Sequence, residues 1–189
     1  CQPFSHAGVS ARENLGQSHG FECKTQGTLF FSIERIAKIK KPKILLLENV
    51  KNIVGHNKKH TFKIIKKAIE SLGYSFNWKV IDSSSLVPQK RNRCFMVCVR
   101  GGIKFNFPEF SKKELPLKSI LEKKVGNQYT ISDKLWAGHQ RRTQRNIKRG
   151  TGFTAFEADI QKPANTLVAR YGKDGKECLI PQKEGNPRM

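Results

Sequence analysis

Three groups of reactive side chains occur along the chain in an order that could support attack on an electron-poor heterocycle. They are the thiol of Cys1, the carboxyl group of Glu48, and the guanidinium groups of Arg91 and Arg93. A thiolate can add to such a ring, a carboxyl group can hydrogen-bond a ring nitrogen, and guanidinium groups can bind a carbonyl oxygen or a phosphate. We therefore treat these four residues as candidate catalytic residues.

Taken singly, each of these features has an ordinary structural explanation. Cys1 could be a small buried cysteine, and Glu48 could be a strand-end carboxylate that caps a helix or pairs with a lysine. Gln89 alternates with the two arginines, so the three side chains would share one side of an extended segment. Such a segment could equally be a solvated basic loop. Only the combination of the three groups is informative.

The sequence before Glu48 predicts a helix and then a strand. Apolar residues recur at three- and four-residue steps from Leu29 to Ala37, which predicts a helix that ends before Pro42. Residues 43–47 form a continuous aliphatic run, which predicts a strand buried on both faces, as in a parallel sheet. Glu48 would then stand at the carboxyl edge of the sheet, where α/β proteins bind ligands.

The sequence after Glu48 continues the same α/β pattern. A second helix is expected over roughly residues 58–72, with Gly73 at its C-terminal cap. Residues 76–82 and 94–100 predict two strands, which could form an antiparallel pair. We therefore predict an α/β domain over residues 1–107.

The composition and the apolar pattern of the chain change after Pro108. Apolar periodicity becomes sparse and glycines are frequent. Residues 165–170 are a short strand candidate, and a turn at residues 173–176 leads into residues 177–181, which predicts a hairpin. We therefore predict a second domain over residues 108–189, small, irregular and mostly β.

The charge of the chain points to a polyanionic partner. Lys and Arg total 36 against 15 Asp and Glu, which gives a net charge of +21. Repulsion among so many like charges destabilises a folded protein unless a polyanion neutralises it. Nucleic acid is therefore the expected partner. The alternative is a solvated basic surface in a protein from a lysine-favouring genome.

The cysteine and histidine patterns predict a reducing compartment and no metal site. Five cysteines at irregular spacing favour neither a disulfide framework nor a zinc ribbon. Cys94 and Cys98 stand in an apolar run and are expected in the core. His56 and His60 have the spacing of a helical metal pair but lack a nearby carboxylate, so surface histidines are expected. Neither a signal peptide nor a membrane-spanning segment is predicted.

Together, the motifs resemble those of bacterial restriction-modification DNA cytosine C5-methyltransferases. The family pattern is PCQPFS, then ENV at a strand end, then QxRxR before an apolar strand. The chain has CQPFS at residues 1–5, ENV at 48–50 and QKRNR at 89–93, and residues 27–31 resemble a further family motif. The four motifs occur in the family order and cover nearly all of residues 1–100.

The resemblance implies a role for each candidate catalytic residue. Cys1 would add to C6 of a cytosine that has been flipped out of the duplex, since C6 cannot be reached inside a stacked helix. Glu48 would contact the N3 and N4 edge of the base, and Arg91 and Arg93 would contact its O2 and a neighbouring phosphate. S-adenosylmethionine would supply the methyl group.

The resemblance also implies binding residues. Asn49 and Gln89 would organise the base pocket, and Leu29 would lie near the cofactor. Ser5 and Arg12 belong to a loop over residues 5–20 that would close over double-stranded DNA. In residues 108–189, which resemble the family's target-recognition domain, the candidate DNA contacts are Thr166 and Arg170, followed by Arg141, Arg142 and Arg145, which could also be simply solvated.

The chain departs from the family pattern in one respect. The FxGxGG-type loop and the following acidic residue, which hold S-adenosylmethionine in the family, do not occur in it. The expected fold is therefore the C-terminal half of a Rossmann-like methyltransferase sheet plus the target-recognition domain, with the cofactor site largely outside the chain. The chain would be inactive alone. It would be a piece of an enzyme, one subunit of a split enzyme whose second chain binds the cofactor, or an incomplete sequence, and it would act in a bacterial cytosol.

Three other functions compete with this interpretation. Cys1 could be the N-terminal nucleophile of an amidohydrolase, with its own amine as base. The protein could instead be a non-catalytic DNA-binding module that retains the motifs. The substrate could also be transfer RNA, because RNA-methylating relatives share these motifs, although the long basic segment after residue 108 favours DNA.

Overall fold

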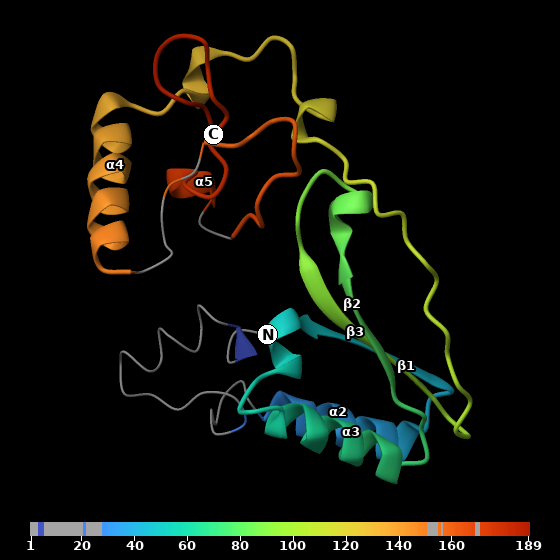
Figure 1. Ribbon diagram of the computed structural model, residues 1–189. Coiled ribbons are helices and arrows are strands. Elements are labelled where there is room, and N and C mark those ends of the chain that lie inside the picture. The colour runs from blue at the N-terminus through green and yellow to red at the C-terminus, as the bar shows by residue number, and fades with distance from the viewer. Residues whose placement is uncertain (1–3, 6–20, 22–27, 151–154, 156, 169–170) are drawn as a thin grey trace. The chain divides into compact units, whose positions relative to one another are not determined.

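The computed structural model describes residues 4–5, 21, 28–150, 155, 157–168 and 171–189 of the chain (Figure 1). The chain divides into two compact units. The first comprises Cys1–Ile81 and Asn92–Glu109, and the second comprises Asp82–Arg91 and Phe110–Met189. Residues 82–91 therefore belong with the C-terminal unit, whereas the sequence analysis placed them in the domain over residues 1–107.

A three-stranded sheet in the order β1-β3-β2 forms the centre of the first unit. Its strands are β1 (Ile44–Val50), β2 (Asn77–Asp82) and β3 (Asn92–Val99). β1 pairs antiparallel with β3, from Ile44 opposite Val99 to Val50 opposite Arg93. An antiparallel bridge between Tyr74 and Arg100 shows that β2 and β3 also run antiparallel, as the sequence predicted.

The environment of β1 differs from the prediction of a doubly buried strand in a parallel sheet. Its described neighbour is antiparallel, and two of its aliphatic residues on one face are exposed, Ile44 at 58% and Leu46 at 68%. An unbroken Ile-Leu run hides this alternation, because every position is apolar whichever way it points. β1 is thus an edge strand with one uncovered face among the described residues.

Two helices pack together beside this sheet, and both were predicted. They are α2 (Leu29–Lys40) and α3 (His60–Ser71) (Figure 1). α3 buries Phe62, Ile65 and Ile69 and turns its lysines outward. Gly73 follows α3 with φ of +82°, a left-handed conformation that glycine adopts without steric cost.

The core of the first unit contains the two cysteines that the sequence placed there. Cys94 and Cys98 are fully buried on β3 and pack with residues of α3 and with Met96. Burial raises the pKa of both thiols to about 11, and the nearby carboxylate of Glu48 adds to the effect at Cys94. Both thiols therefore stay protonated at neutral pH.

His56 is a correction to the sequence analysis, which expected a surface histidine. Its side chain is buried, its Nδ1 lies 2.7 Å from the hydroxyl of Thr61, and its ring meets the ring of Phe4 edge-on. The contact with Phe4 spans 52 residues of sequence, so no local pattern could reveal it. His60 is exposed, as expected.

The second unit contains a helix that the sequence analysis missed, α4 (Asp133–Lys148), and a single turn, α5 (Tyr171–Asp174). α4 escaped detection because its inward face carries polar side chains, including the buried His139, and not an apolar stripe. It begins at Ser132, whose hydroxyl accepts a hydrogen bond from the amide of Leu135 at 3.3 Å.

The hairpin predicted over residues 165–181 does not form among the described residues. α5 stands where the turn was expected, and residues 179 and 180 form isolated bridges with Glu157 and Arg188 instead. Apart from short 3-10 helices, the rest of the described part of this unit consists of extended segments that single bridges join, without a sheet of its own. Its small core is built from Leu117, Ala164 and Cys178.

Four short 3-10 helices complete the described elements: η3 (Lys51–Val54), η4 (Ser83–Ser85), η5 (Leu117–Ser119) and η6 (Asn127–Tyr129). None of the described helices is long and apolar enough to cross a membrane. The described residues also contain no cluster of three or more His, Cys, Asp or Glu side chains that could hold a metal ion.

The raised thiol pKa values predict that stability falls at high pH. The thiols titrate near 9.0 in the unfolded chain and near 11 in the folded one, so above pH 9 the unfolded state loses protons that the folded state keeps. The free energy of unfolding should fall between these values, by about 1–3 kcal/mol per thiol. Urea denaturation at pH 8 and pH 10.5 measures the fall.

Other groups titrate in the same range, so a matched variant isolates the thiols. The double variant Cys94→Ala, Cys98→Ala lacks both titrations and should lose less stability between the two pH values than the unaltered chain. Equal losses in the two proteins would contradict the prediction.

Candidate active site

An ion pair joins two of the candidate catalytic residues. Nε of Arg93 lies 2.9 Å from Oε1 of Glu48, and Nη1 of Arg93 donates to the carbonyl of Asn92 at 2.8 Å. The arginine side chain is 19% exposed and the glutamate 40%. The guanidinium is thus held on two sides, while the carboxylate remains accessible to a ligand.

The strand register explains why these two residues meet. Glu48 stands opposite Phe95 and Val50 opposite Arg93, so Glu48 and Arg93 are diagonal neighbours on one face of the sheet. Leu46 shares this face and is exposed. The pair therefore lies on the face that the described helices leave uncovered.

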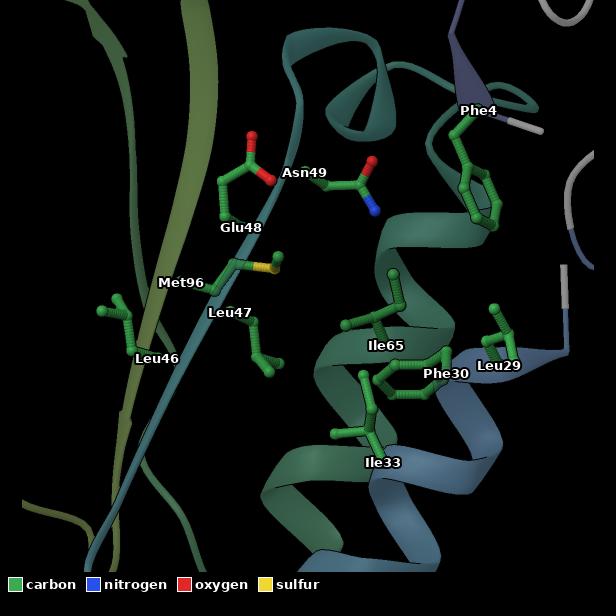
Figure 2. A pocket seen from close by; sticks show the side chains of 10 residues that line it. All are labelled: Phe4, Leu29, Phe30, Ile33, Leu46, Leu47, Glu48, Asn49, Ile65 and Met96. Carbon is green, nitrogen blue, oxygen red and sulfur yellow. The ribbon is translucent and has the colours of Figure 1, made fainter. Parts of the chain in front are cut away.

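Asn49 points the other way, toward α2 and α3 (Figure 2). Its side-chain oxygen accepts a hydrogen bond from the amide of Val50 at 2.9 Å. The alternation of side chains along a strand thus sends two adjacent polar residues, Glu48 and Asn49, to opposite faces. Asn49 is the polar residue of β1 that faces the helices.

A pocket of about 380 Å³ lies along β1 and α2 (Figure 2). Its polar groups come from Glu48 and Asn49, and the other eight lining residues are apolar: Phe4, Leu29, Phe30, Ile33, Leu46, Leu47, Ile65 and Met96. Leu29, the candidate cofactor contact, is largely exposed in this lining. The pocket can hold an apolar or aromatic group beside a carboxylate and an amide.

A hydrogen bond anchors Phe4, which follows Cys1 by three residues in the sequence. The side-chain amide of Asn52 in η3 donates to the carbonyl of Phe4 at 2.8 Å. The buried ring of Phe4 meets His56 edge-on, with ring centres 5.3 Å apart, and Phe21 at 5.6 Å. Phe4 is thus fixed to the turn that begins directly after Val50, at the end of the strand that carries Glu48.

Sequence reasoning missed Asn52 and His56. The available signal was weak: both follow the ENV motif within eight residues and are polar positions in a segment with buried apolar residues. Their partner, Phe4, is distant in sequence. Periodicity therefore gives no indication of the contact.

Three of the remaining candidates, Gln89, Arg91 and Thr166, contact one another's segments within the second unit. Gln89 forms a parallel bridge with Ala164, and the amide of exposed Arg91 lies 3.4 Å from Oδ1 of Asp82, a long hydrogen bond. The hydroxyl of Thr166 donates to the carbonyl of Lys90 at 2.5 Å. The loop at residues 89–91 is therefore tied to the segment at residues 164–166, which the sequence analysis had not linked.

For the other candidates the structure gives only their burial, or does not describe them. Ser5 is half-buried, and Arg141, Arg142 and Arg145 are exposed on α4. Cys1, Arg12 and Arg170 lie outside the described residues. The structure thus brings Glu48, Asn49 and Arg93 to one edge of the first unit and places Gln89, Arg91 and Thr166 together in the second.

Comparison with known proteins identifies the family. Residues 1–187 match the C-5 cytosine-specific DNA methylase family. The chain belongs to this family. The match includes all four motifs on which the resemblance rested, and the family membership inferred from them is confirmed.

Several curated relatives of this methylase chain are bacterial enzymes. The type II methyltransferase M.SsoII of Shigella sonnei is 45% identical over the whole chain, and M1.ScrFI of Lactococcus lactis is 44% identical. The DNA-cytosine methyltransferase of Escherichia coli K12 is 36% identical over 95% of the chain. The chain spans 49%, 48% and 42% of these relatives, about half their length.

Solved structures confirm the α/β fold of the methylase chain. The Entamoeba histolytica methyltransferase EhMeth matches 98% of the chain with a TM-score of 0.58 at 17% identity, and the chain covers 53% of it. The Dnmt2 methyltransferase of S. pombe matches 97% with a TM-score of 0.57 at 15% identity, and the chain covers 54% of it. At these identities the likeness concerns the fold.

A double-mutant cycle should detect the ion pair of Glu48 and Arg93. The variants Glu48→Gln, Arg93→Gln and their combination should give a coupling energy of about 0.5–1 kcal/mol, because the guanidinium is mostly buried and the distance is short. Urea denaturation of the 189-residue chain at neutral pH measures the free energies of unfolding.

The pair of Lys66 and Glu70 on α3 provides a matched control. Its atoms are 3.7 Å apart and its side chains are 51% and 45% exposed. Its coupling energy should be about 0.3–0.5 kcal/mol. A coupling for Glu48 and Arg93 no greater than that of the control would mean that the pair does not hold the strand edge together.

Proposed function

We propose that the protein methylates C5 of cytosine in double-stranded DNA with S-adenosylmethionine, as the modification enzyme of a type II restriction-modification system. The observation that carries this proposal is the ion pair of Glu48 and Arg93 beside the pocket, in a chain of the cytosine methylase family. The bacterial type II methyltransferases that resemble it support both the system and a bacterial cytosol as its location.

In the proposed reaction, the Cys1 thiolate attacks C6 of an extruded cytosine and forms a sulfur–carbon bond. The electron pair of the C5–C6 double bond forms a C4–C5 double bond and the C4–N3 pair moves onto N3, so that C5 becomes the nucleophilic carbon of an enamine and can accept a methyl group. Loss of the C5 proton then restores the double bond and expels the thiolate. The bound cofactor would supply the electrophilic methyl group.

Glu48 would accept a hydrogen bond from the N4 amino group of the base and, in its protonated form, donate one to N3, which stabilises the negative charge that develops in the ring. Arg93 would serve in two ways, by holding the Glu48 carboxylate and by contacting the base O2, with Arg91 on O2 or a neighbouring phosphate. Asn49 would shape the pocket from the helix side. These roles follow from the resemblance and agree with the positions of Glu48, Asn49 and Arg93.

The anchored Phe4 supports Cys1 as the nucleophile. Asn52 holds the carbonyl of Phe4, three residues after Cys1 in the sequence, in the turn that follows the ENV motif. A nucleophile must lie within contact distance of the atom that it attacks. Asn52 would act here as a positioning residue.

The remaining candidates would bind DNA outside the base pocket. Gln89 would support the pocket, and Ser5 and Arg12 would belong to the loop that closes over DNA. Thr166 already holds the loop at residues 89–91 through Lys90, so it would position that loop beside DNA, with Arg170 a further contact.

The pocket fits S-adenosylmethionine only in part. It offers an apolar wall, including Leu29 and Phe30, beside Glu48 and Asn49. Among its described lining residues, however, no second carboxylate is available for the ribose hydroxyls, and the sequence has no FxGxGG-type loop. Most of the cofactor site would therefore belong to a cofactor-binding half, supplied by the same polypeptide or by a second chain.

The exposed apolar side chains of α2 and β1 support such a half. Ile36 and Ile39 on α2 and Ile44 and Leu46 on β1 are each more than half exposed. Burying an aliphatic side chain contributes about 1.5–3 kcal/mol, so leaving four exposed is unfavourable. We propose that the cofactor-binding half covers them.

In the complete protein, Cys1→Ala should abolish methyl transfer and the covalent trapping of DNA that contains 5-fluorocytosine. Without the thiol no bond to C6 can form, and with fluorine at C5 the bond cannot resolve. Denaturing electrophoresis detects the trapped complex. Cys178→Ala, which removes a buried thiol of the second unit, should leave trapping intact.

The alternatives give different outcomes in the same experiment. Persistent trapping by the Cys1 variant would show that another group attacks the base. A non-catalytic DNA-binding protein would bind the duplex without trapping and would give no heat on titration with S-adenosylmethionine. Methylation of RNA and not of DNA would overturn the assigned substrate.

Ile36→Asp should distinguish the complete protein from the 189-residue chain. In the 189-residue chain, where Ile36 is 57% exposed, the substitution should lower the free energy of unfolding by less than about 1 kcal/mol, as measured by urea denaturation. In the complete protein it should cost about 3 kcal/mol or more, because an unpaired carboxylate would be buried under the cofactor-binding half. Ile120→Asp, at a residue of the second unit that is 63% exposed, is the control and should be mild in both. Equal costs for Ile36→Asp in the two proteins would show that nothing covers α2.

A further inference from the structure

One face of α4 carries a row of cations. Arg141, Arg145, Lys148 and Arg149 follow one another at intervals of four, three and one residues, so they line one side of the helix. With Gln144 they surround a shallow depression of about 400 Å³. Arg142 is exposed as well but does not line this depression. We call these four cations the α4 basic face.

The structure fixes the direction of this face. On the opposite side of α4, His139 is buried and the hydroxyl of Thr143 accepts a hydrogen bond from the amide of Ala155 at 3.0 Å. At the start of the helix, the amide of Asn186 donates to Oδ1 of Asp133 at 2.7 Å. α4 therefore cannot rotate its basic face inward without losing these contacts.

The charges on this face are not balanced within the described structure. The one acidic residue of α4 is Asp133, in its first turn and bound to Asn186. No ion pair between described residues involves any of the four cations. Like charges three and four residues apart destabilise a helix by about 0.2–0.5 kcal/mol per pair. Repulsion within the α4 basic face thus destabilises the helix, and a bound polyanion would remove that repulsion.

Stabilisation of the helix itself does not account for the whole face. Cations in the last turn of a helix interact favourably with its dipole, which explains Lys148 and Arg149. This effect falls off within one turn, so it does not extend to Arg141. A single exposed lysine or arginine needs no explanation, but four of them gathered on one face of one helix do.

We propose that the α4 basic face binds the phosphate backbone of DNA and raises affinity without reading sequence. This inference rests on the proposed function for its ligand. The face is about 10–12 Å long from Arg141 to Arg149, at 1.5 Å per residue, which suits several phosphates of a duplex. Its arginines can bind phosphate oxygens in a bidentate manner.

The composition of the face favours phosphates over base edges or a membrane. Gln144 is its one neutral polar side chain, whereas base readout requires several groups that both donate and accept hydrogen bonds. A membrane-binding helix would carry large apolar side chains beside its cations, and the residues around this depression include none.

The test compares two triple variants of the complete methyltransferase. Arg141→Gln, Arg145→Gln, Lys148→Gln removes three charges from the α4 basic face. The control, Lys63→Gln, Lys66→Gln, Lys67→Gln, removes three charges from exposed lysines of α3. Glutamine preserves helix propensity in both variants. Circular dichroism verifies that both remain folded.

The readout is the dissociation constant for a duplex between about 50 and 200 mM salt. Each lost phosphate contact should reduce the slope of log affinity against log salt by about 0.9, so the α4 variant should lose up to about 3 units of slope. The ratio of affinities for methylatable and unrelated duplexes should stay unchanged. The α3 variant should keep the slope of the unaltered enzyme.

The outcomes separate this inference from the proposed function. Methyl transfer by the unaltered enzyme tests the function by itself. If that enzyme methylates DNA but the two variants have equal slopes, the inference fails and the function stands. A change in sequence preference would overturn the claim that the face does not read bases. Unchanged DNA binding would favour an acidic protein as the partner and would also overturn the inference.

Discussion

The antiparallel pairing of β1 with β3 is the constraint from which the geometry of the site follows. Side chains alternate between faces along a strand, so the register decides which residues share a face. The observed register puts Glu48 on the uncovered face with Arg93, and Asn49 on the helix face opposite Cys94. A slip of one residue would carry the Glu48 carboxylate to the core face, next to buried thiols, where an ionised group would be costly. The apolar core therefore enforces the position of the ion pair.

The turn after β1 extends this constraint to the start of the chain. η3 begins directly after Val50 and presents Asn52, whose amide holds the carbonyl of Phe4, while His56 packs against the Phe4 ring. The same strand end thus places the carboxylate and fixes the segment beyond Cys1. Two motifs that are separated by more than 40 residues are held together by one turn and one hydrogen bond.

Sequence alone predicts the elements of the first unit well because their apolar periodicity is strong, as in α3, or their composition is uniformly aliphatic, as in β1. It fails where burial depends on partners that are distant in sequence. His56 is buried by Phe4, and α4 is held by hydrogen bonds and a buried histidine where a pattern search expects an apolar stripe. The motifs predict that Glu48 and Arg93 act together, but only the strand register shows how they meet.

Short-range and long-range electrostatics have separate tasks in this chain. Glu48 and Arg93 neutralise each other at 2.9 Å, so their pair contributes little field beyond its immediate surroundings. The net charge of +21 acts over a distance limited by salt screening, about 8 Å at physiological ionic strength, and attracts any polyanion regardless of sequence. Orientation of a single base must then come from hydrogen bonds with fixed geometry, because a diffuse field cannot distinguish one base from its neighbours. In the proposed function, the guanidinium of Arg93, mostly buried and bound on two sides, would meet that requirement, whereas exposed cations such as those of α4 would serve for attraction.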